Sequence, residues 1–557
     1  MRWVQPGQVL RTRGIECSPP AQDERRVEPM ARERPKARVA IGVEGEKTMS
    51  TSLAILRAAQ QSPDRIAVAG KGYARTWAQT ADRTARLAAG LQGLGLAVGD
   101  RLAILAGNCA EHMDITHAAV WAGIVIVPIN TRLSAVEVAA ILQDSGAAAI
   151  AYDAAHRALA TDVSTDIGIG IRITLADDPD AIGFSDLLRA EPIDPVAVPD
   201  DALLGLYYTG GTTGKPKGVE LTHLGFHVTS LDTLVALRTD QNCVYLHVAP
   251  FFHLADCTGG NAVTYAQGTH VFLDDLSPVG LVRAIEEFDV NVISLVPTQF
   301  HSLLDTVGNH PALARVRKVY YGAAPISPAL LNRLLQAFTA AEFYQCYGQT
   351  EIAGACVFLP PEEHYPGSPN LGRTGKIGVS SYAKVVDADG KEQPFGTPGE
   401  ILFRGARVMR GYWGMPETTA ETLVDGWLHT GDVGVMTEGG FITVVDRMKD
   451  MIVTGGENVF CGEVESVISQ FPQVSAVAIV GVPDEIWGEA VHAFIVPEKG
   501  AEPDPAEILK SAREKLAGYK TPKGVTFVDA LPLSGVGKVR KDVLRNLWKS
   551  RQKKDQQ

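Results

Sequence analysis

The spacing of apolar residues between positions 76 and 130 alternates between a helical and a strand period. Residues 76–95, TWAQTADRTARLAAGLQGLG, carry apolar residues at a helical period and end at glycine, which predicts an amphipathic helix. Residues 101–107, RLAILAG, predict a short buried strand, residues 110–123 a helix, and residues 124–130, IVIVPIN, a second buried strand. Apolar strands that alternate with helices predict a parallel sheet covered on both faces.

Two later segments repeat this pattern. Residues 290–297, VNVISLVP, and residues 318–327, KVYYGAAPIS, predict further buried strands. Ser327 and Pro328 suit the N-cap and the first position of a helix, so we expect a helix to begin there.

The pattern changes after about residue 372. Residues 384–405 and 439–447 contain short apolar runs separated by turn dipeptides, which predicts antiparallel strands. Past Asp446 a smaller unit of helices and strands follows, at residues 463–470, 474–482, 490–497 and 505–519 and near Arg540. We therefore expect a domain boundary at residues 447–450, with domains at residues 49–447 and 448–557.

The first 48 residues differ from the rest of the chain. They are rich in Arg, Glu and Pro, lack the apolar core of a secretory signal, and carry too many acidic residues for a transit peptide. Met49 then opens a periodic segment. We expect residues 1–48 to be a disordered extension or the product of an upstream start of translation.

Composition narrows the classes of protein. A chain of 557 residues is too long for one ordinary core, so at least two domains are expected. The longest apolar run, residues 118–128, is about half of the ~20 residues that cross a bilayer, so no integral membrane segment is expected. A net charge of −12 argues against nucleic-acid binding. Seven cysteines without a CxxC pair predict reduced thiols and a cytoplasmic protein, and disfavour zinc.

A loop rich in glycine, threonine and lysine lies within residues 207–223, YYTGGTTGKPKGVELTH. Such loops bind phosphate because unhindered backbone N–H groups can surround an anion and lysines add charge. The P-loop pattern fails twice, because Thr209 replaces its first glycine and Pro216 follows Lys215 where a hydroxyl is needed. A flexible surface turn with solvated lysines is the alternative interpretation.

TGGTTGKPKG resembles a signature of the adenylate-forming superfamily, which includes acyl-CoA synthetases, beetle luciferases and peptide-synthetase adenylation domains. Other segments match its further signatures in the expected order: PFFHL at 250–254, YGAAP at 321–325, YGQTE at 347–351, GEILFRG at 399–405, GWLHTGD ending at Asp432, DRMKDMIVTGGENV from Asp446, and SGVGKVRK with Lys538. Each motif alone is weak, but the ordered set is specific and spans about residues 52–548. The chain is therefore similar to the AMP-forming acyl-CoA synthetases for fatty or aryl acids.

The resemblance implies an α/β fold. A large N-terminal domain of sandwiched mixed sheets and helices would be joined by a hinge to a small, mobile α+β C-terminal cap domain. The implied enzyme activates a carboxylic acid with ATP and Mg²⁺ to an acyl adenylate. It then transfers the acyl group to coenzyme A, releasing AMP and pyrophosphate. The implied partners are these small molecules, and a homodimer is left open.

The resemblance also implies the roles of residues that bind the nucleotide. The β- and γ-phosphates would lie against Thr209, Gly210, Gly211, Thr212, Thr213, Gly214, Lys215 and Lys217. Adenine would stack on Tyr347, next to Gly348, with its edge along Gly322, Ala323, Ala324 and Pro325. Asp432 and Arg447 would bind the ribose hydroxyls.

The residues implied near the reacting atoms come from several motifs. Thr350 would donate a hydrogen bond to the α-phosphate, and Glu351 would bind Mg²⁺, with Thr209 as a second candidate ligand. Lys538 would contact the acyl carboxylate and the bridging oxygen. His253 would control access to the acyl pocket.

The family carries out its second step after the small domain rotates. Lys449 matches the position of the hinge, and Gly455 and Gly456 match the segment beside the pantetheine tunnel. The chain departs from the usual pattern at Cys461 and Gly462, which replace Pro-Ala. Cys461 is interpreted as a small buried filler or as an oxidation-sensitive thiol.

Each assignment has a structural alternative. Asp432 is also a candidate turn cap, Glu351 a helix cap, Arg447 and Lys449 a solvated linker, and His253 a structural residue.

The function also has alternatives. One is an acyl-AMP ligase that delivers the acyl group to a carrier protein, and another is a nucleotide sensor without chemistry. Amino-acid activators are disfavoured because residues 251–253 contain no aspartate. Expected pocket segments at residues 226–234, 296–301 and 322–349 suggest an apolar acid, whether fatty, aromatic or alicyclic.

Overall fold

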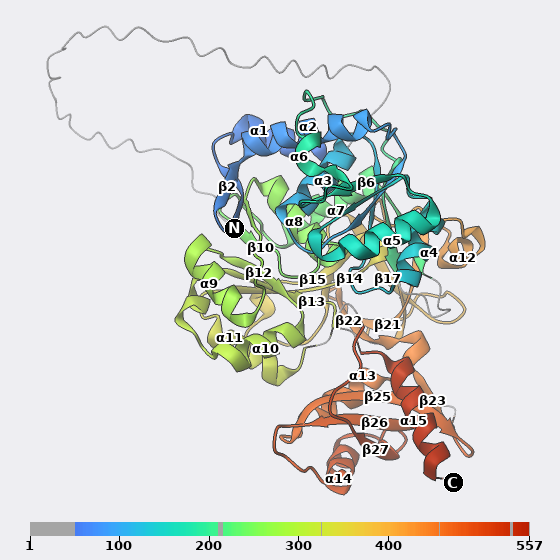
Figure 1. Ribbon diagram of the computed structural model, residues 1–557. Helices are drawn as coiled ribbons and strands as arrows, with labels where there is room; N and C mark the ends of the chain where they lie inside the picture. Colours follow the sequence, from blue (N-terminus) through green and yellow to red (C-terminus); the bar gives the residue numbers. More distant parts are fainter. Residues whose placement is uncertain (1–50, 210–215, 325, 456, 535–538, 556–557) are drawn as a thin grey trace, which may run out of the picture. The chain divides into compact units, whose positions relative to one another are not determined.

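The computed structural model describes residues 51–209, 216–324, 326–455, 457–534 and 539–555. Within these residues the strands form three sheets, of 14, 8 and 5 strands (Figure 1). The expectation of a disordered N-terminal extension falls on residues outside this set. Among the described helices, none combines the length and the apolar character that crossing a membrane requires.

The sheet of eight strands contains the first predicted strand–helix–strand unit. The order of its strands is β19-β9-β8-β4-β3-β5-β6-β7. The bounds are β3 (Arg101–Leu105), β4 (Val125–Pro128), β5 (Ala149–Tyr152), β6 (Ile171–Thr174), β7 (Ile182–Gly183), β8 (Leu203–Thr209), β9 (Lys217–Thr222) and β19 (Gly411–Tyr412). β3 pairs in parallel with both β4 and β5, as the apolar pattern predicts.

The helices that precede and connect these strands are α1 (Ser52–Gln61), α2 (Trp77–Gly93), α3 (Ala110–Trp121), α4 (Ala135–Ser145), α5 (Arg157–Ile167) and α6 (Phe184–Leu187). Of these helices, α2, α3 and α4 begin at a residue whose side chain caps the helix. Thr76 and Gln79 form a capping box at the start of α2. α3 ends at Trp121, slightly before the predicted end, because Gly123 has a left-handed φ of +73°.

The sheet of 14 strands is parallel from β14 to β1 and antiparallel toward both edges. Its order is β17-β18-β21-β22-β16-β15-β14-β13-β12-β10-β11-β1-β2, with β20 paired to β21. The bounds are β1 (Ile66–Gly70), β2 (Tyr73–Thr76), β10 (Val244–Leu246), β11 (Thr269–Val271), β12 (Val292–Leu295), β13 (Lys318–Gly322), β14 (Glu342–Gln349), β15 (Gly354–Leu359), β16 (Gly375–Ile377), β17 (Ser381–Val386), β18 (Gly399–Gly405), β20 (Leu423–Val424), β21 (Trp427–Met436) and β22 (Phe441–Arg447).

Helices cover both faces of the parallel part of this sheet. They are α7 (His223–Ala236), α8 (Leu254–Ala266), α9 (Pro278–Phe288), α10 (Pro297–Val307) and α11 (Pro328–Ala337), and α12 (Pro416–Thr422) lies further along the chain. Ile293 and Val319 pack with α9, α10 and α11, whereas Val292 and Tyr320 pack on the side of α8. α11 begins as predicted, with the Ser327 hydroxyl accepting a hydrogen bond from the Leu330 backbone N–H.

The sheet of five strands lies in the C-terminal part of the chain, which Figure 1 colours orange to red. Its strands are β23 (Ile452–Thr454), β24 (Glu457–Val459), β25 (Val474–Asp484), β26 (Gly488–Pro497) and β27 (Gly524–Phe527). The helices are α13 (Cys461–Ile468), α14 (Pro505–Lys515) and α15 (Lys541–Asp555). A short 3-10 helix, η5 (Met448–Asp450), separates β22 of the large sheet from β23. The exact limits of the domains stay a prediction.

Candidate active site

Asp432 and Arg447 lie directly opposite each other on the antiparallel strands β21 and β22. Arg447 Nε lies 2.7 Å from Asp432 Oδ1. The Asp432 side chain is only 2% exposed, whereas that of Arg447 is 42% exposed. The two residues predicted to bind the ribose are therefore neighbours, with the arginine reaching toward solvent.

The Asp432 carboxylate also receives hydrogen bonds from two residues of β14. The Tyr347 hydroxyl donates to Asp432 Oδ2, and Gln349 Nε2 donates to the same oxygen at 2.6 Å. Burial and the neighbouring carboxylate raise the pKa of Tyr347 well above its usual value. Asp432 thus fixes the ring that we expect to face adenine. Gln349 of the YGQTE motif had no predicted role of its own, although its two-residue spacing from Tyr347 places both on one face of the strand.

The alternative role of Asp432 as a turn cap does not match the contacts. The Thr430 hydroxyl, and not the Asp432 carboxylate, accepts the local backbone bond, from the Asp432 N–H at 3.0 Å. The Asp432 carboxylate instead contacts Tyr347 and Gln349 of β14 and Arg447 of β22.

Glu351 lies in a 3-10 turn, η3 (Thr350–Ile352), that directly follows β14. Its Oε1 accepts a hydrogen bond of 2.9 Å from the Tyr412 hydroxyl, and its backbone carbonyl accepts one of 2.8 Å from the Met409 N–H. Burial and the Glu351 carboxylate raise the pKa of Tyr412 above its usual value. No side-chain bond caps η3, so the structure gives Glu351 no capping role.

Tyr412 connects Glu351 to the end of the predicted phosphate loop. Lys217 Nζ lies 4.8 Å from the centre of the Tyr412 ring, which is the range of a cation–π contact. Thr209 and Lys217 are paired residues of β8 and β9, so they form the base of a hairpin. The loop residues Gly210, Gly211, Thr212, Thr213, Gly214 and Lys215 lie outside the described residues. Tyr412 had no predicted role, because a lone aromatic residue after a strand carries no specific signal.

Glycines allow the strand ends of the predicted adenine site to approach one another closely. A Cβ on Gly322 would lie 2.0 Å from the Cys346 carbonyl oxygen, and one on Gly348 would lie 1.8 Å from that of Gly354. The pairing of β14 and β15 shifts register between Tyr347 and Gly348. Ala323 has a φ of +62°, and Pro325 lies outside the described residues. Side chains at Gly322 or Gly348 would force these strands apart.

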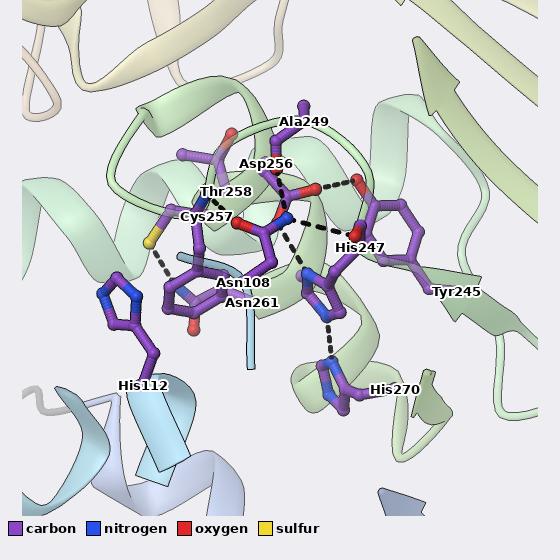
Figure 2. A network of polar contacts seen from close by, with 12 residues as sticks. Asn108, His112, Tyr245, His247, Ala249, Asp256, Cys257, Thr258, Asn261 and His270 are labelled. Carbon is purple, nitrogen blue, oxygen red and sulfur yellow. Dashed lines mark hydrogen bonds and ion pairs between the residues drawn. The ribbon is translucent and has the colours of Figure 1, made fainter. Parts of the chain in front are cut away.

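His253 is the N-terminal flanking residue of α8, in a segment supported by a buried polar network. Asn108 Nδ2 donates hydrogen bonds to the carbonyl oxygens of His247 (3.1 Å) and Ala249 (2.8 Å). Its Oδ1 accepts one from the Phe251 N–H at 2.8 Å. Figure 2 shows the Asn108 side chain between these groups. One side chain therefore fixes the backbone that leads to His253.

Below this segment lies a row of buried ionisable side chains (Figure 2). Asp256 Oδ2 lies 2.6 Å from His247 Nδ1, and Asp256 Oδ1 accepts a hydrogen bond of 3.0 Å from the Tyr245 hydroxyl. His247 Nε2 lies 3.0 Å from His270 Nδ1. Burial lowers the pKa of His270 well below its usual value, so this ring is neutral at pH 7.

A small cavity lies beside this network. Its lining includes Phe226 of α7, Phe251, and Cys257 and Asn261 of α8. Of the segments expected to line the acyl pocket, only residues 226–234 contribute to it. Thr116 and His117 of α3 also line it, and its volume of about 10 Å³ is close to that of a single water site.

The C-terminal residues with predicted roles lie in and after η5. Lys449 is exposed, and Gly455 has a left-handed φ of +60° with its N–H bonded to the Trp487 carbonyl at 2.8 Å. Cys461 is fully buried, and its thiol donates to the Asp450 carbonyl at 3.1 Å. Burial raises the pKa of this thiol, which favours the filler interpretation over a reactive thiol. Gly456 and Lys538 lie outside the described residues.

Comparison with models of protein families shows the family of this chain. The model of the AMP-binding enzyme family matches residues 55–413. The chain belongs to this family. The model of the AMP-binding enzyme C-terminal domain matches residues 463–538.

This AMP-binding enzyme is similar to curated proteins and solved structures over most of its length. Feruloyl-CoA synthase of Amycolatopsis sp is 37% identical over 499 residues, which are 88% of this chain and 97% of that protein. The fatty acid–[acyl-carrier-protein] ligase ScoC of Streptomyces coeruleorubidus is 34% identical, covering 88% and 94%. The structure of o-succinylbenzoate CoA synthetase (MenE) from Bacillus subtilis, in complex with the acyl-adenylate intermediate OSB-AMP, is 30% identical. It covers 90% of this chain and 98% of that one, with a TM-score of 0.78.

These comparisons confirm the predicted superfamily, the mixed α/β fold with a large N-terminal and a small C-terminal domain, and an AMP-forming acyl-CoA synthetase that uses ATP and CoA. The roles of individual residues stay predictions.

Proposed function

We propose that this AMP-binding enzyme activates an acid with an apolar body, with aromatic acids as preferred substrates. One observation supports the binding of ATP in this proposal: contacts through the Asp432 carboxylate join Tyr347, Asp432 and Arg447 in one cluster. The similarity to feruloyl-CoA synthase of Amycolatopsis sp supports an aromatic acid.

In the first step a carboxylate oxygen of the acid bonds to the α-phosphorus of ATP. The bond from this phosphorus to the bridging oxygen breaks, and the electron pair leaves with pyrophosphate. We assign the ribose to Asp432 and Arg447, the adenine to Tyr347, and the α-phosphate to Thr350. Lys217 and the hairpin loop that it closes would offset the charge of the departing phosphates.

Mg²⁺ bound with ATP would offset phosphate charge. The donor set suits it, because Glu351 offers a carboxylate and Thr209 a hydroxyl, and Mg²⁺ prefers hard oxygen ligands. We propose these two residues as its protein ligands.

In the second step the sulfur of coenzyme A bonds to the acyl carbon. The thiol loses its proton to solvent, the bond from the acyl carbon to the AMP oxygen breaks, and its electron pair leaves with AMP. We propose that rotation at Lys449 brings the Gly455–Gly456 segment to this reaction.

Replacement of Lys538 by alanine tests the division into two steps. We expect adenylation to fall about 10²–10³-fold, because a positive charge at the reacting carboxylate is lost. Thioester formation from a supplied acyl adenylate should persist. Equal loss in both half-reactions would remove this role from Lys538.

A pyrophosphate-release screen tests the class of acid. Ferulic, benzoic, octanoic and 4-hydroxybutyric acids should be compared at equal concentration with ATP and Mg²⁺. We expect the aromatic acids to give the highest rates. A clear preference for octanoic acid would overturn the aromatic part of the proposal, and a preference for 4-hydroxybutyric acid would overturn the apolar part.

A carrier protein is the alternative acceptor, and the similarity to ScoC is the observation that favours it. Formation of the acyl thioester from CoA in the absence of any carrier protein supports CoA. Accumulation of acyl adenylate with CoA present, followed by transfer to a carrier, would support the alternative.

We also propose a cytoplasmic location. The six cysteines among the described residues are free thiols, which is typical of a reducing compartment. Cell fractionation tests the location, and light scattering of the purified chain distinguishes a monomer from the homodimer that the sequence leaves open.

A further inference from the structure

Arg407 is a fully buried arginine in the segment that connects β18 and β19. Its side chain is 0% exposed, and its Nη1 lies 2.6 Å from Asp232 Oδ2. Asp232, in α7, is 1% exposed. An ion pair removed from water to this degree is costly unless further hydrogen bonds complete it.

The partners of this ion pair come from several elements. The Ser380 hydroxyl donates to Asp232 Oδ2 at 2.8 Å. Gly378 leaves room for the carboxylate, since a Cβ there would lie 2.3 Å from Asp232 Oδ2. Asp232 is therefore fixed in one position, from which it orients the Arg407 guanidinium.

The remaining nitrogen atoms of Arg407 contact the backbone that follows Glu351. Nε donates to the Ile352 carbonyl at 3.1 Å, and Nη2 donates to the Ala355 carbonyl. These two carbonyls flank the left-handed residue Ala353, which has a φ of +55°. The planar guanidinium thus fixes the exit of the turn that carries Glu351.

Residues close to Arg407 contact the same turn from the other side. The Met409 N–H donates to the Glu351 carbonyl at 2.8 Å, and the Tyr412 hydroxyl donates to its carboxylate at 2.9 Å. Arg407 therefore anchors a connecting segment that contacts both the backbone and the side chain of Glu351.

We propose that Arg407, oriented by Asp232, is a positioning residue that places the Glu351 carboxylate for binding of ATP with its divalent cation. This inference rests on the metal-binding role proposed for Glu351. Arg407 touches neither substrate nor metal and acts through the Thr350–Ile352 turn.

The variant Arg407→Lys separates charge from geometry. Lysine retains a positive charge beside Asp232, but its single ammonium group does not reproduce the planar, three-way contact with Asp232 and two carbonyls. Arg75→Lys is a matched control, because Arg75 forms a largely buried, two-bond ion pair with Asp114 of α3, and neither residue belongs to the proposed site.

The test is equilibrium binding of α,β-methylene-ATP, which does not transfer its nucleotide, to the full chain with Mg²⁺ and with EDTA. In the wild type we expect Mg²⁺ to increase the affinity. In Arg407→Lys this increase should shrink about tenfold, the scale typical of residues that orient a metal ligand. The affinity in EDTA should be unchanged, and Arg75→Lys should match the wild type in both conditions.

Glu351→Gln separates failure of this inference from failure of the proposed function. If Glu351→Gln retains the full gain in affinity from Mg²⁺, the metal role of Glu351 is wrong and the inference falls with it. If Glu351→Gln loses the gain but Arg407→Lys keeps it, only the positioning role is overturned. If Arg407→Lys does not fold, the charge-free pair Arg407→Met with Asp232→Asn replaces it, with the same expected loss and the same contradicting result.

Discussion

Two segments of the proposed site rest on buried polar supports of opposite character. Below the Glu351 turn lies the charged support, Arg407 with Asp232. Below the segment that carries His253 lies the histidine support, formed by Asn108, His247, Asp256 and His270 (Figure 2). Arginine keeps its charge at every ordinary pH, whereas burial lowers the pKa of His270 well below its usual value, so this imidazole gains a charge only in acid. The first support therefore depends on charge pairing, and the second on hydrogen bonds that acid can disturb.

The largest effect is expected from removing one charge of the charged support. Asp232→Ala leaves the Arg407 guanidinium buried without its partner, so we expect a loss of about 3–5 kcal/mol in the free energy of unfolding. Urea denaturation at pH 7.5 measures this loss. Arg407→Met combined with Asp232→Asn should recover most of it, and a double variant no more stable than Asp232→Ala would contradict the importance of charge pairing.

Acid should lower the free energy of unfolding through His112 and His117, two buried histidines of α3 near the histidine support. Burial lowers the pKa of His112 and of His117 to about 4, despite nearby carboxylates of Asp153 and Asp256 for the former and of Asp114 for the latter. Their pKa in the unfolded chain is about 6.5, so between this value and about 4 the unfolded state binds more protons than the folded state. The free energy of unfolding therefore decreases as the pH is lowered. From pH 7.5 to pH 5 each imidazole should cost about 2 kcal/mol, and the two about 4 kcal/mol together.

The His117→Gln variant isolates one imidazole. The ionisable groups that face His117 are Asp114 and His247. We expect the dependence of unfolding free energy on pH to be shallower in the variant than in the wild type. Parallel profiles would show that His117 titrates alike in the folded and unfolded chain.

Loss of Asn108 should affect the acid more than the nucleotide. Asn108→Ala leaves the buried carbonyls of His247 and Ala249 and the Phe251 N–H without their partner, at a cost of about 1–3 kcal/mol. Because Asn108 holds the backbone that leads to His253, the residue expected at the acyl pocket, the KM for the acid should rise while that for ATP stays constant. A rise in the KM for ATP alone would contradict this prediction, because it would mean that Asn108 supports the nucleotide site and not the acid site.

The smallest effect is expected at the rim of the charged support. Ser380→Ala removes one hydrogen bond from Asp232, which keeps Arg407, so the loss should be about 1 kcal/mol. The midpoint of urea denaturation measures it. A loss as large as that of Asp232→Ala would mean that Ser380, and not Arg407, is the main partner of this carboxylate.

Local signals in the sequence predict much of the fold. The cap at Ser327, the amphipathic helix after Thr76 and the apolar runs of β3, β4, β12 and β13 are encoded within a few residues, and the structure has each of them. The antiparallel strands after residue 372 are predicted for the same reason.

The supports of the site carry no such local signal. Arg407 and Asp232 are 175 residues apart, and a lone charged residue in a sequence is typical of a solvated surface. Asn108 likewise contacts backbone about 140 residues away, so only the fold brings the partners together. Motifs identify residues that we expect to touch the substrates, but the residues that orient them become visible only through burial and contacts.

The pairing of Asp432 with Arg447 has a consequence for changes in chain length. The turn between β21 and β22, at residues 437–440, and the register shift between Val433 and Gly434 together set which residues of the two strands face each other. Successive residues of a strand point to opposite faces, so inserting or deleting a single residue there would turn the Arg447 guanidinium away from the carboxylate. Natural variation in this hairpin should therefore appear as changes of residue type at constant length.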